Sequence, residues 1–426
     1  MLRPTPRLLF AALLLAPAAH AAETTRVSVS SAGAQAGGVS TEPALSANGR
    51  FAVFTSLASN LVPVDTNDAS DVFLHDRKSG QTVRVSVSTG GVQVTGDSGE
   101  PAISANGRFV AFASQAANLV PGDGNGTWDI FVHDRKTVST RRVSVSSGGV
   151  EGNGLSSTPS ISANGRFVAF TSMADNLVAD DTNAGNDVFV HDLKTGKTSR
   201  VSVSSAGEEG DISSFQPSIS SSGRFVAFAS AATNLVPGDS NGEVDVFVHD
   251  RKTGKTTMLS LSPGGLPGSD QSQAPSISAN GRLVAFRSFA TNLVPDDANL
   301  TADIFVADRK TGKLSLVSLG PEGIQANQFS SAARISGNGR FVAFLSDATN
   351  LVADDDNAAS DIYVRDLKAA TTTRASVSTE GGEGNSSSIQ PAISATGRFA
   401  AFASTATNLV PDDSNGAYDI FVRDRK

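Results

Sequence analysis

The sequence predicts an all-β fold, a seven-bladed β-propeller with four antiparallel strands in each blade. A 58-residue unit occurs seven times without insertion or deletion, and its Gly-Arg pairs place glycines at 49, 107, 165, 223, 281, 339 and 397. Each unit holds short apolar runs bounded by turn residues and shows no 3.6-residue periodicity, which favours strands over helices. Four-stranded units that cannot bury both faces alone, repeated in series, are typical of a propeller.

Each unit is expected to contain four strands, and the first copy illustrates the pattern. The first strand is Pro43 to Ser46, and an Asn-Gly turn, the strongest short hairpin signal, joins it to the second at Arg50 to Ser56. The third is Asp71 to Asp76, and another tight turn leads to the fourth at Thr82 to Ser88. The second and third strands are apolar on both faces, so both faces should be covered. The Val-Ser alternation of the fourth strand is typical of an outer strand with one wet face.

Recurring side chains indicate how the blades pack. Of the 23 Phe residues, 19 fall at the positions of Phe51, Phe54 and Phe73, where they are expected to fill the gap between neighbouring sheets. Arg50 and Asp76 also recur in every copy and are expected to pair across the second and third strands. Histidine occurs at one position of the third strand in four successive copies, namely His75, His133, His191 and His249. We expect this position to tolerate substitution and to be partly exposed.

The two ends of the chain are expected to meet in one blade. Lys426 stands at the phase of Lys78, so the last copy stops after its third strand. The segment Thr25 to Ser30 then supplies the fourth strand, because its Arg-Val-Ser-Val-Ser matches the segment Arg84 to Ser88. This closure removes a free sheet edge. A parallel β-helix is the alternative repeat fold, but its turns are shorter than this unit and its ends need capping.

Residues 1–22 are expected to be a secretory signal peptide, which leaves 23–426 as the propeller. Arg3 and Arg7 precede the apolar stretch Leu8 to Pro17, and small residues follow it. The stretch is shorter than the roughly 20 residues that a membrane-spanning helix needs. We therefore expect a periplasmic or secreted protein without a membrane span.

The composition argues against several classes of protein. With 42 acidic and 34 basic side chains the formal net charge is -8, which argues against nucleic acid as a partner. The absence of Cys excludes disulfides, Cys-ligated zinc and thiol nucleophiles. Five histidines leave little material for a histidine metal centre.

The repeats resemble the TolB-type, WD40-like (PD40) propeller repeats. That pattern runs Ser-Pro-Asp-Gly-Arg, then an apolar strand ending Ala-Phe-x-Ser, then Ile-Tyr-Val-x-Asp and Thr-Gly. The matching segments in this chain are Ser104 to Arg108, Val110 to Ser114, Asp187 to Asp192 and Thr195-Gly196. The resemblance covers the whole chain after the signal peptide and implies the propeller fold. In this chain Ala-Asn replaces Pro-Asp, Phe usually replaces Tyr, and a long loop separates the second and third strands.

The best candidate for chemistry is the motif Asp-x-Asn-x-x-x-Asp in the loop between the second and third strands. Oxygen ligands spaced along a short loop suit a hard cation such as calcium, which takes six to eight oxygens at about 2.3 to 2.6 Å. The alternative is structural: Asp and Asn make Asx-turns, and the last Asp accepts backbone N–H bonds where the third strand starts. The candidate ligands are Asp65, Asn67, Asp71, Asp123, Asn125, Asp129, Asp181, Asn183, Asp187, Asp239, Asn241, Asp245, Asp297, Asn299, Asp303, Asp355, Asn357, Asp361, Asp413, Asn415 and Asp419.

Function is expected on the face that carries the long loops, where the copies differ. The candidate binding residues are Trp128 and Tyr418 in these loops, and Arg287 and Phe289 at the end of a second strand. We predict an exported, non-catalytic scaffold that binds a protein or a cell-envelope glycan, because no repeat gathers a catalytic set of unlike groups. The alternative is a propeller enzyme, such as a polysaccharide lyase, hydrolase or lactonase, with a site on the axis. An axial pocket lined by several carboxylates plus His or Tyr would favour the enzyme.

Overall fold

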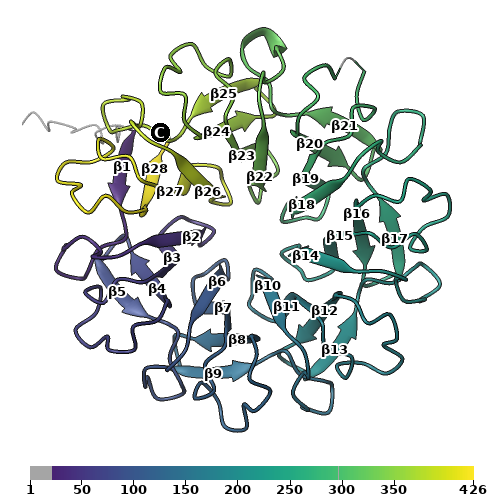
Figure 1. The fold of residues 1–426 in the computed structure, drawn as a ribbon, viewed down its shortest axis with the longest axis horizontal. Coiled ribbons are helices and arrows are strands. Elements are labelled where there is room, and N and C mark those ends of the chain that lie inside the picture. The colour runs from purple at the N-terminus through teal and green to yellow at the C-terminus, as the bar shows by residue number, and fades with distance from the viewer. Residues whose placement is uncertain (1–21, 296) are drawn as a thin grey trace, which may run out of the picture.

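The computed structural model describes residues 22–295 and 297–426, which form seven four-stranded antiparallel sheets arranged as blades around one axis (Figure 1). The predicted seven-bladed propeller is therefore confirmed. Almost all of the predicted signal peptide, residues 1–21, lies outside the described residues. Within the described part of the chain no helix is long and apolar enough to cross a membrane.

Blades 1 to 6 each take four consecutive strands, from β2 to β25, and blade 7 takes β26, β27, β28 and β1. The innermost strands are β2 (Ser40–Leu45), β6 (Ser98–Ile103), β10 (Ser156–Ile161), β14 (Ser214–Ile219), β18 (Ser272–Ile277), β22 (Ser330–Ile335) and β26 (Ser388–Ile393). The second strands are β3 (Phe51–Ser56), β7 (Phe109–Ser114), β11 (Phe167–Ser172), β15 (Phe225–Ser230), β19 (Leu283–Ser288), β23 (Phe341–Ser346) and β27 (Phe399–Ser404). The third strands are β4 (Asp71–Asp76), β8 (Asp129–Asp134), β12 (Asp187–Asp192), β16 (Asp245–Asp250), β20 (Asp303–Asp308), β24 (Asp361–Asp366) and β28 (Asp419–Asp424). The outermost strands are β1 (Glu23–Arg26), β5 (Gln81–Arg84), β9 (Ser139–Arg142), β13 (Lys197–Arg200), β17 (Lys255–Met258), β21 (Lys313–Leu316) and β25 (Thr371–Arg374), and a single 3₁₀ turn, η1 (Pro321–Gly323), follows β21.

The predicted closure of the ring is present in blade 7. Strand β1 pairs antiparallel with β28, with Glu23 opposite Asp424 and Arg26 opposite Phe421, and the two strands lie side by side near the C-terminus in Figure 1. The Val27 N–H then donates to the Ile420 carbonyl at 2.8 Å. Because β1 covers the edge of β28, no blade of the described chain is left with three strands.

Large and small side chains alternate between neighbouring blades. In blade 1, Phe54 and Phe73 stack with ring centroids 6.0 Å apart and are fully buried against small residues of blade 7 such as Ala401. On the opposite face of the same sheet, Val53 packs against Phe112 of blade 2. Seven such interfaces form the core, so each blade depends on its two neighbours for burial.

Two details of the repeat differ from the sequence prediction. The fourth strand ends at Arg84, and Val85 and Ser86 turn inward to 1% and 0% exposure instead of alternating on a wet edge. The reason is a buried hydrogen bond from the Ser86 hydroxyl to Asp71 Oδ1, at 2.5 Å. The histidine position is also buried, since His75 is 7% exposed and its Nδ1 lies 2.9 Å from the hydroxyl of Thr82.

The predicted pairing of Arg50 with Asp76 is confirmed and is bidentate. Nε lies 2.8 Å from Oδ1 and Nη2 lies 2.6 Å from Oδ2. The Arg50 guanidinium holds the pKa of the Asp76 carboxyl well below its usual range. An equivalent Arg–Asp pair links the second and third strands in every blade.

Candidate functional site

The long-loop face is a connected surface, because each blade holds the loops of its neighbour. The side chain of Asn60, in the loop between β3 and β4, donates to the Gln35 carbonyl at 2.8 Å and accepts the Gly37 N–H at 2.8 Å. Gln35 and Gly37 belong to the connection that leaves blade 7. The same asparagine contact recurs at the other blade junctions, which explains why this residue is present in all seven copies.

The predicted metal motif surrounds an arginine in blade 1. Nη1 of Arg84 lies 3.1 Å from Asp65 Oδ1 and 2.9 Å from Asp71 Oδ2, and only 8% of the Arg84 side chain is exposed. Asn67 donates to Asp71 Oδ2 at 3.2 Å and to the Val94 carbonyl at 3.0 Å. The guanidinium supplies the positive charge between the two carboxylates. The two hydrogen bonds of Asn67 hold the loop in place, which is a structural role.

Five blades have this internal cation, and three of them add a third carboxylate. The arginines are Arg26, Arg84, Arg142, Arg200 and Arg374. In blades 2, 3 and 6 a glutamate joins the two aspartates, and each group of three carboxylates lies within 4.8 Å, close enough to hold a metal ion. In each of these groups the arginine contacts all three carboxylates.

Blades 4 and 5 have the same aspartates without the arginine, which Met258 and Leu316 replace. In blade 5, Gln325 Nε2 donates to both carboxylates of the motif, at 2.7 and 2.8 Å. Blade 4 has Pro267 in the place of that glutamine. Burial, followed by repulsion from Asp245, raises the pKa of Asp239 to about 6. Calcium binding stays a prediction. Blades 4 and 5 are the two blades in which no arginine would compete with the ion.

The four predicted binding residues have different surroundings. Trp128 and Tyr418 are half-buried and pack against the hydrophobic clusters at their own blade junctions. Arg287 packs against a pair of aromatic rings whose centroids are 6.2 Å apart, at 5.3 Å from the centroid of Phe289 and 5.8 Å from that of Phe329 in the next blade. Burial lowers the pKa of Arg287, and its Nε is buried without a hydrogen-bond partner.

Exposed apolar side chains occur at or next to the long-loop ends of the two inner strands in blades 1, 3 and 4. We call this set the apolar collar; its exposed members are Val39 at 39%, Leu57 at 58%, Leu155 at 37%, Met173 at 54% and Ile212 at 49%. Phe289 and Phe329 occupy the same repeat positions at the junction of blades 5 and 6 and are half-buried. Blade 2 has Asp97 and Gln115 at these positions, so the exposed members form one group in blade 1 and another in blades 3 and 4. Exposed apolar groups of this kind are typical of interaction surfaces.

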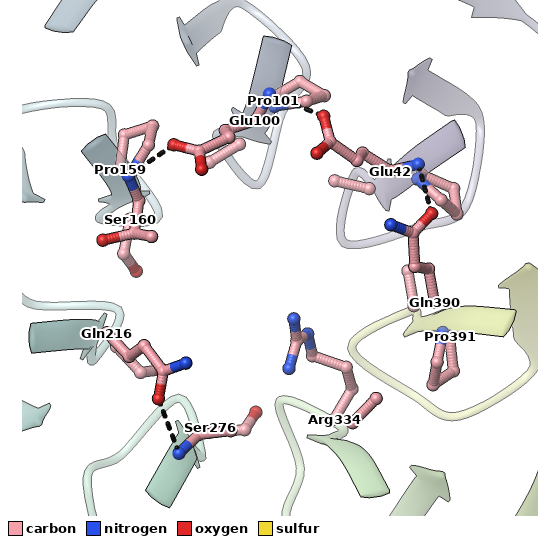
Figure 2. A pocket seen from close by; sticks show the side chains of 18 of the residues that line it. Glu42, Glu100, Pro101, Pro159, Ser160, Gln216, Ser276, Arg334, Gln390 and Pro391 are labelled. Atoms are coloured by element: carbon pink, nitrogen blue, oxygen red, sulfur yellow. Dashed lines mark hydrogen bonds between the residues drawn. The ribbon is translucent and has the colours of Figure 1, made fainter. Parts of the chain in front are cut away.

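The seven inner strands enclose an axial cavity of about 520 Å³ (Figure 2). Its wall carries hydrogen bonds from one blade to the next: the Glu42 N–H donates to Gln390 Oε1 at 2.9 Å, and the Glu100 N–H donates to Glu42 Oε2 at 2.7 Å. The Thr158 N–H donates to Glu100 Oε2 at 2.6 Å. These residues adopt positive φ, between 50 and 56°, in a β-bulge of each inner strand.

The charges in the cavity are unevenly distributed. Of the described residues that line it, Glu42, Glu100 and Arg334 are the charged ones, and none is His or Tyr. Both glutamates lie along the wall, whereas Arg334 projects into the cavity from blade 6 (Figure 2). Burial raises the pKa of Glu100, whereas the Arg334 side chain is exposed to the cavity.

Sequence reasoning missed the collar, the axial glutamates and Arg334. Aligning the seven copies residue by residue would have found Arg334, because the other copies have Ala or Ser at its position. It would also have found Leu57 and Met173, since Gln, Ala, Asp and Thr stand there in four other copies.

Comparison with solved structures supports the fold. An oligogalacturonate lyase in complex with manganese matches with a TM-score of 0.57 and 12% identity, over 94% of this chain and 92% of that chain. The propeller domain of the trilobed protease from Pyrococcus furiosus, described as having an open velcro topology, matches with a TM-score of 0.55 and 10% identity, over 91% and 94% of the two chains. TolB from Acinetobacter baumannii matches with a TM-score of 0.41 and 12% identity, over 89% and 82%.

No family model matches the chain, and a search of curated proteins gives no match. The oligogalacturonate lyase and the propeller domain of the trilobed protease are only 12% and 10% identical to this chain, so these matches support a β-propeller fold and establish no activity.

Proposed function

We propose that this chain is an exported, non-catalytic propeller that binds a protein through the apolar collar on its long-loop face. Export rests on the N-terminal pattern of Arg3, Arg7 and the apolar stretch after them. The collar is the observation that carries the binding function. Of the two partner classes expected from the sequence, a cell-envelope glycan and a protein, the collar favours the protein.

The chemistry of the collar supports this choice. Its exposed members are aliphatic side chains and methionine, which bury well against another protein. Sugar rings are usually stacked on exposed Trp or Tyr faces, and in this chain Trp128 and Tyr418 are half-buried at blade junctions. The asparagine contacts between loops keep the surface ordered before binding, which lowers the entropic cost of association.

The axial cavity gives little support to the alternative of an enzyme. A glycosidase-type reaction needs two carboxylates free to transfer a proton or attack the sugar. Glu42 Oε2 accepts the Glu100 N–H and the Thr55 hydroxyl, and Glu100 Oε2 accepts the Thr158 N–H. These bonds give the two glutamates a structural role along the wall.

The collar can be tested with residues that other blades already use at the same positions. Leu57→Gln with Met173→Gln copies Gln115 of blade 2, so the double variant should fold. The matched control is Leu266→Glu, which copies Glu208 at an exposed apolar position on an outer loop. A partner captured by crosslinking from envelope extracts should bind the wild type and the control with equal affinity, and the collar variant at least about tenfold more weakly.

Two results would contradict the proposal. One is a partner whose affinity is the same for the collar variant and for the control. The other is turnover of a polysaccharide by the mature protein, which would establish the enzyme instead.

A further inference from the structure

The chain of hydrogen bonds along the axial wall is interrupted at blade 6. In blade 5, the Ala274 N–H donates to Gln216 Oε1 of the preceding blade at 2.9 Å. Ala274 and Ala332 have no oxygen in their side chains, so they cannot accept the equivalent N–H groups of Ala332 and Gln390. Two backbone donors in the wall therefore lack the acceptor that the preceding blade provides elsewhere.

A second position that accepts such an N–H is also replaced at this junction. In blade 3 the Thr171 hydroxyl accepts the Gln216 N–H of blade 4 at 3.2 Å. The residue at the same repeat position in blade 5 is Arg287, which has donors only. Blade 5 therefore has an alanine and an arginine at the two positions from which other blades accept the N–H of the next inner strand, as blade 3 does for Gln216 through the Thr171 hydroxyl.

Arg334 adds a free cation to this side of the cavity. Its Nη1 donates to the Ala333 carbonyl at 3.0 Å, and its remaining donors face the cavity. No carboxylate of the described chain lies within 4.0 Å of Arg334 or of Arg287, whereas every Arg50-type arginine has a bidentate carboxylate. The inner strand of blade 6 also has Ala333 where the other six have proline.

We propose that the axial cavity binds a small anionic molecule whose carboxylate or phosphate pairs with Arg334 and with the N–H groups of Ala332 and Gln390. The geometry places the Arg334 guanidinium, which has no carboxylate partner, on the same side of the cavity as two N–H groups without their usual side-chain acceptor. An oxyanion completes such an arrangement. The volume of about 520 Å³ is in the range of small-molecule sites and suits a ligand the size of one or two sugar rings. This site lies inside the ring and uses none of the residues of the apolar collar.

The test is calorimetric titration of the mature chain with four probes: glucuronate, glucose 6-phosphate, inorganic phosphate and glucose. Glucuronate and glucose 6-phosphate distinguish a carboxylate from a phosphate on the same ring, and glucose removes the charge. Arg334→Ser is the informative variant, because Ser160, Ser218 and Ser276 occupy its position in blades 3 to 5. Arg141→Ser is the matched control: it removes the same charge from an exposed site on β9, where blade 3 has Ser199.

We expect at least one anionic probe to bind more tightly than glucose, and Arg334→Ser to weaken it by about ten- to a hundredfold, the usual effect of losing a charged hydrogen-bond partner. Arg141→Ser should leave the affinity within about twofold of the wild type, since an exposed arginine far from the cavity acts only through screened charge. Equal binding of glucose and the anions, an anion affinity unchanged in Arg334→Ser, or no binding of any probe would each overturn the proposal.

Discussion

Blades 1 to 3 and blades 4 to 6 are built on the same 58-residue unit but satisfy their charges differently. In blades 1 to 3 an arginine lies between the loop aspartates of each blade, and the axial glutamates bond to the following blade. In blades 4 and 5 the arginine becomes Met258 and Leu316, and in blades 5 and 6 the axial positions become Ala274 and Ala332. Arg287 and Arg334 then appear in the same sector without carboxylate partners.

This comparison distinguishes repeat positions that hold the fold together from positions that vary between blades. Positions that are identical in all seven copies, such as Asn60 and the Arg50–Asp76 pair, hold loops and strands together. Positions that change from blade to blade, such as those of Met258, Leu316 and Arg334, alter charge and hydrogen bonding while the strands keep their registers. Blade 6, by contrast, keeps Arg374 among its loop carboxylates. A repeat protein can vary such positions one blade at a time, because each unit contacts mainly its neighbours.

Converting blade 1 to the blade 4 pattern should have the largest effect on stability. Arg84→Met leaves Asp65 and Asp71 buried without their cation, and breaking a buried ion pair costs about 3–5 kcal/mol. We expect a clear decrease in the urea midpoint of the mature chain at pH 7. Met258→Leu, which copies Leu316, is the control and should cost less than about 1.5 kcal/mol. A midpoint for Arg84→Met equal to that of the control would contradict the role given to the arginine.

The opposite change, Met258→Arg, should stabilise blade 4 in a pH-dependent way. The folded state raises the pKa of Asp239 to about 6, so the wild type loses stability as the pH rises from about 4 to 6 and this carboxyl loses its proton. An arginine at 258 would pair with the ionised form and remove that loss. The gain in melting temperature should be largest above pH 6 and shrink toward pH 4. A difference that stays constant across this range would contradict the assignment.

Completing the axial wall should have a smaller effect. In Ala332→Gln the new amide oxygen can accept the Gln390 N–H, as Gln390 itself does for Glu42, and one such bond contributes about 1 kcal/mol. Gln216→Ala removes the equivalent bond to Ala274 and should lose about the same amount. Urea midpoints that move in the same direction for both variants would show that the wall bonds do not stabilise the ring.

Calcium should give the smallest change in melting temperature. Five of the seven loop motifs contain an arginine that competes with the ion, so only the motifs of blades 4 and 5 are left to bind it. After treatment with EDTA, added calcium should raise the melting temperature by about 1 °C, and Asp239→Asn with Asp297→Asn should remove this increase. Asp65→Asn is the control in a blade with an arginine. No change in melting temperature on adding calcium would exclude the ion.

The ring and its closure follow from the sequence because the repetition is explicit, down to the segment at Thr25 that completes the last copy. The end of the fourth strand and the burial of His75 do not, because a Val-Ser alternation looks the same whether the serine faces water or a buried aspartate. The arginine among the loop carboxylates was also hidden: Arg84 is 13 residues from Asp71 and reaches it only across the β4–β5 hairpin. The cavity around Arg334 exists only where seven inner strands meet.

Diffraction from crystals soaked in bromide tests the unpaired donors on the axis most directly, because the anomalous signal locates the anion. We expect a bromide within hydrogen-bond distance of the Arg334 guanidinium in the wild type and none at that position in Arg334→Ser. Bromide bound only at outer surfaces, with an empty axial cavity in the wild type, would contradict an anion site on the axis.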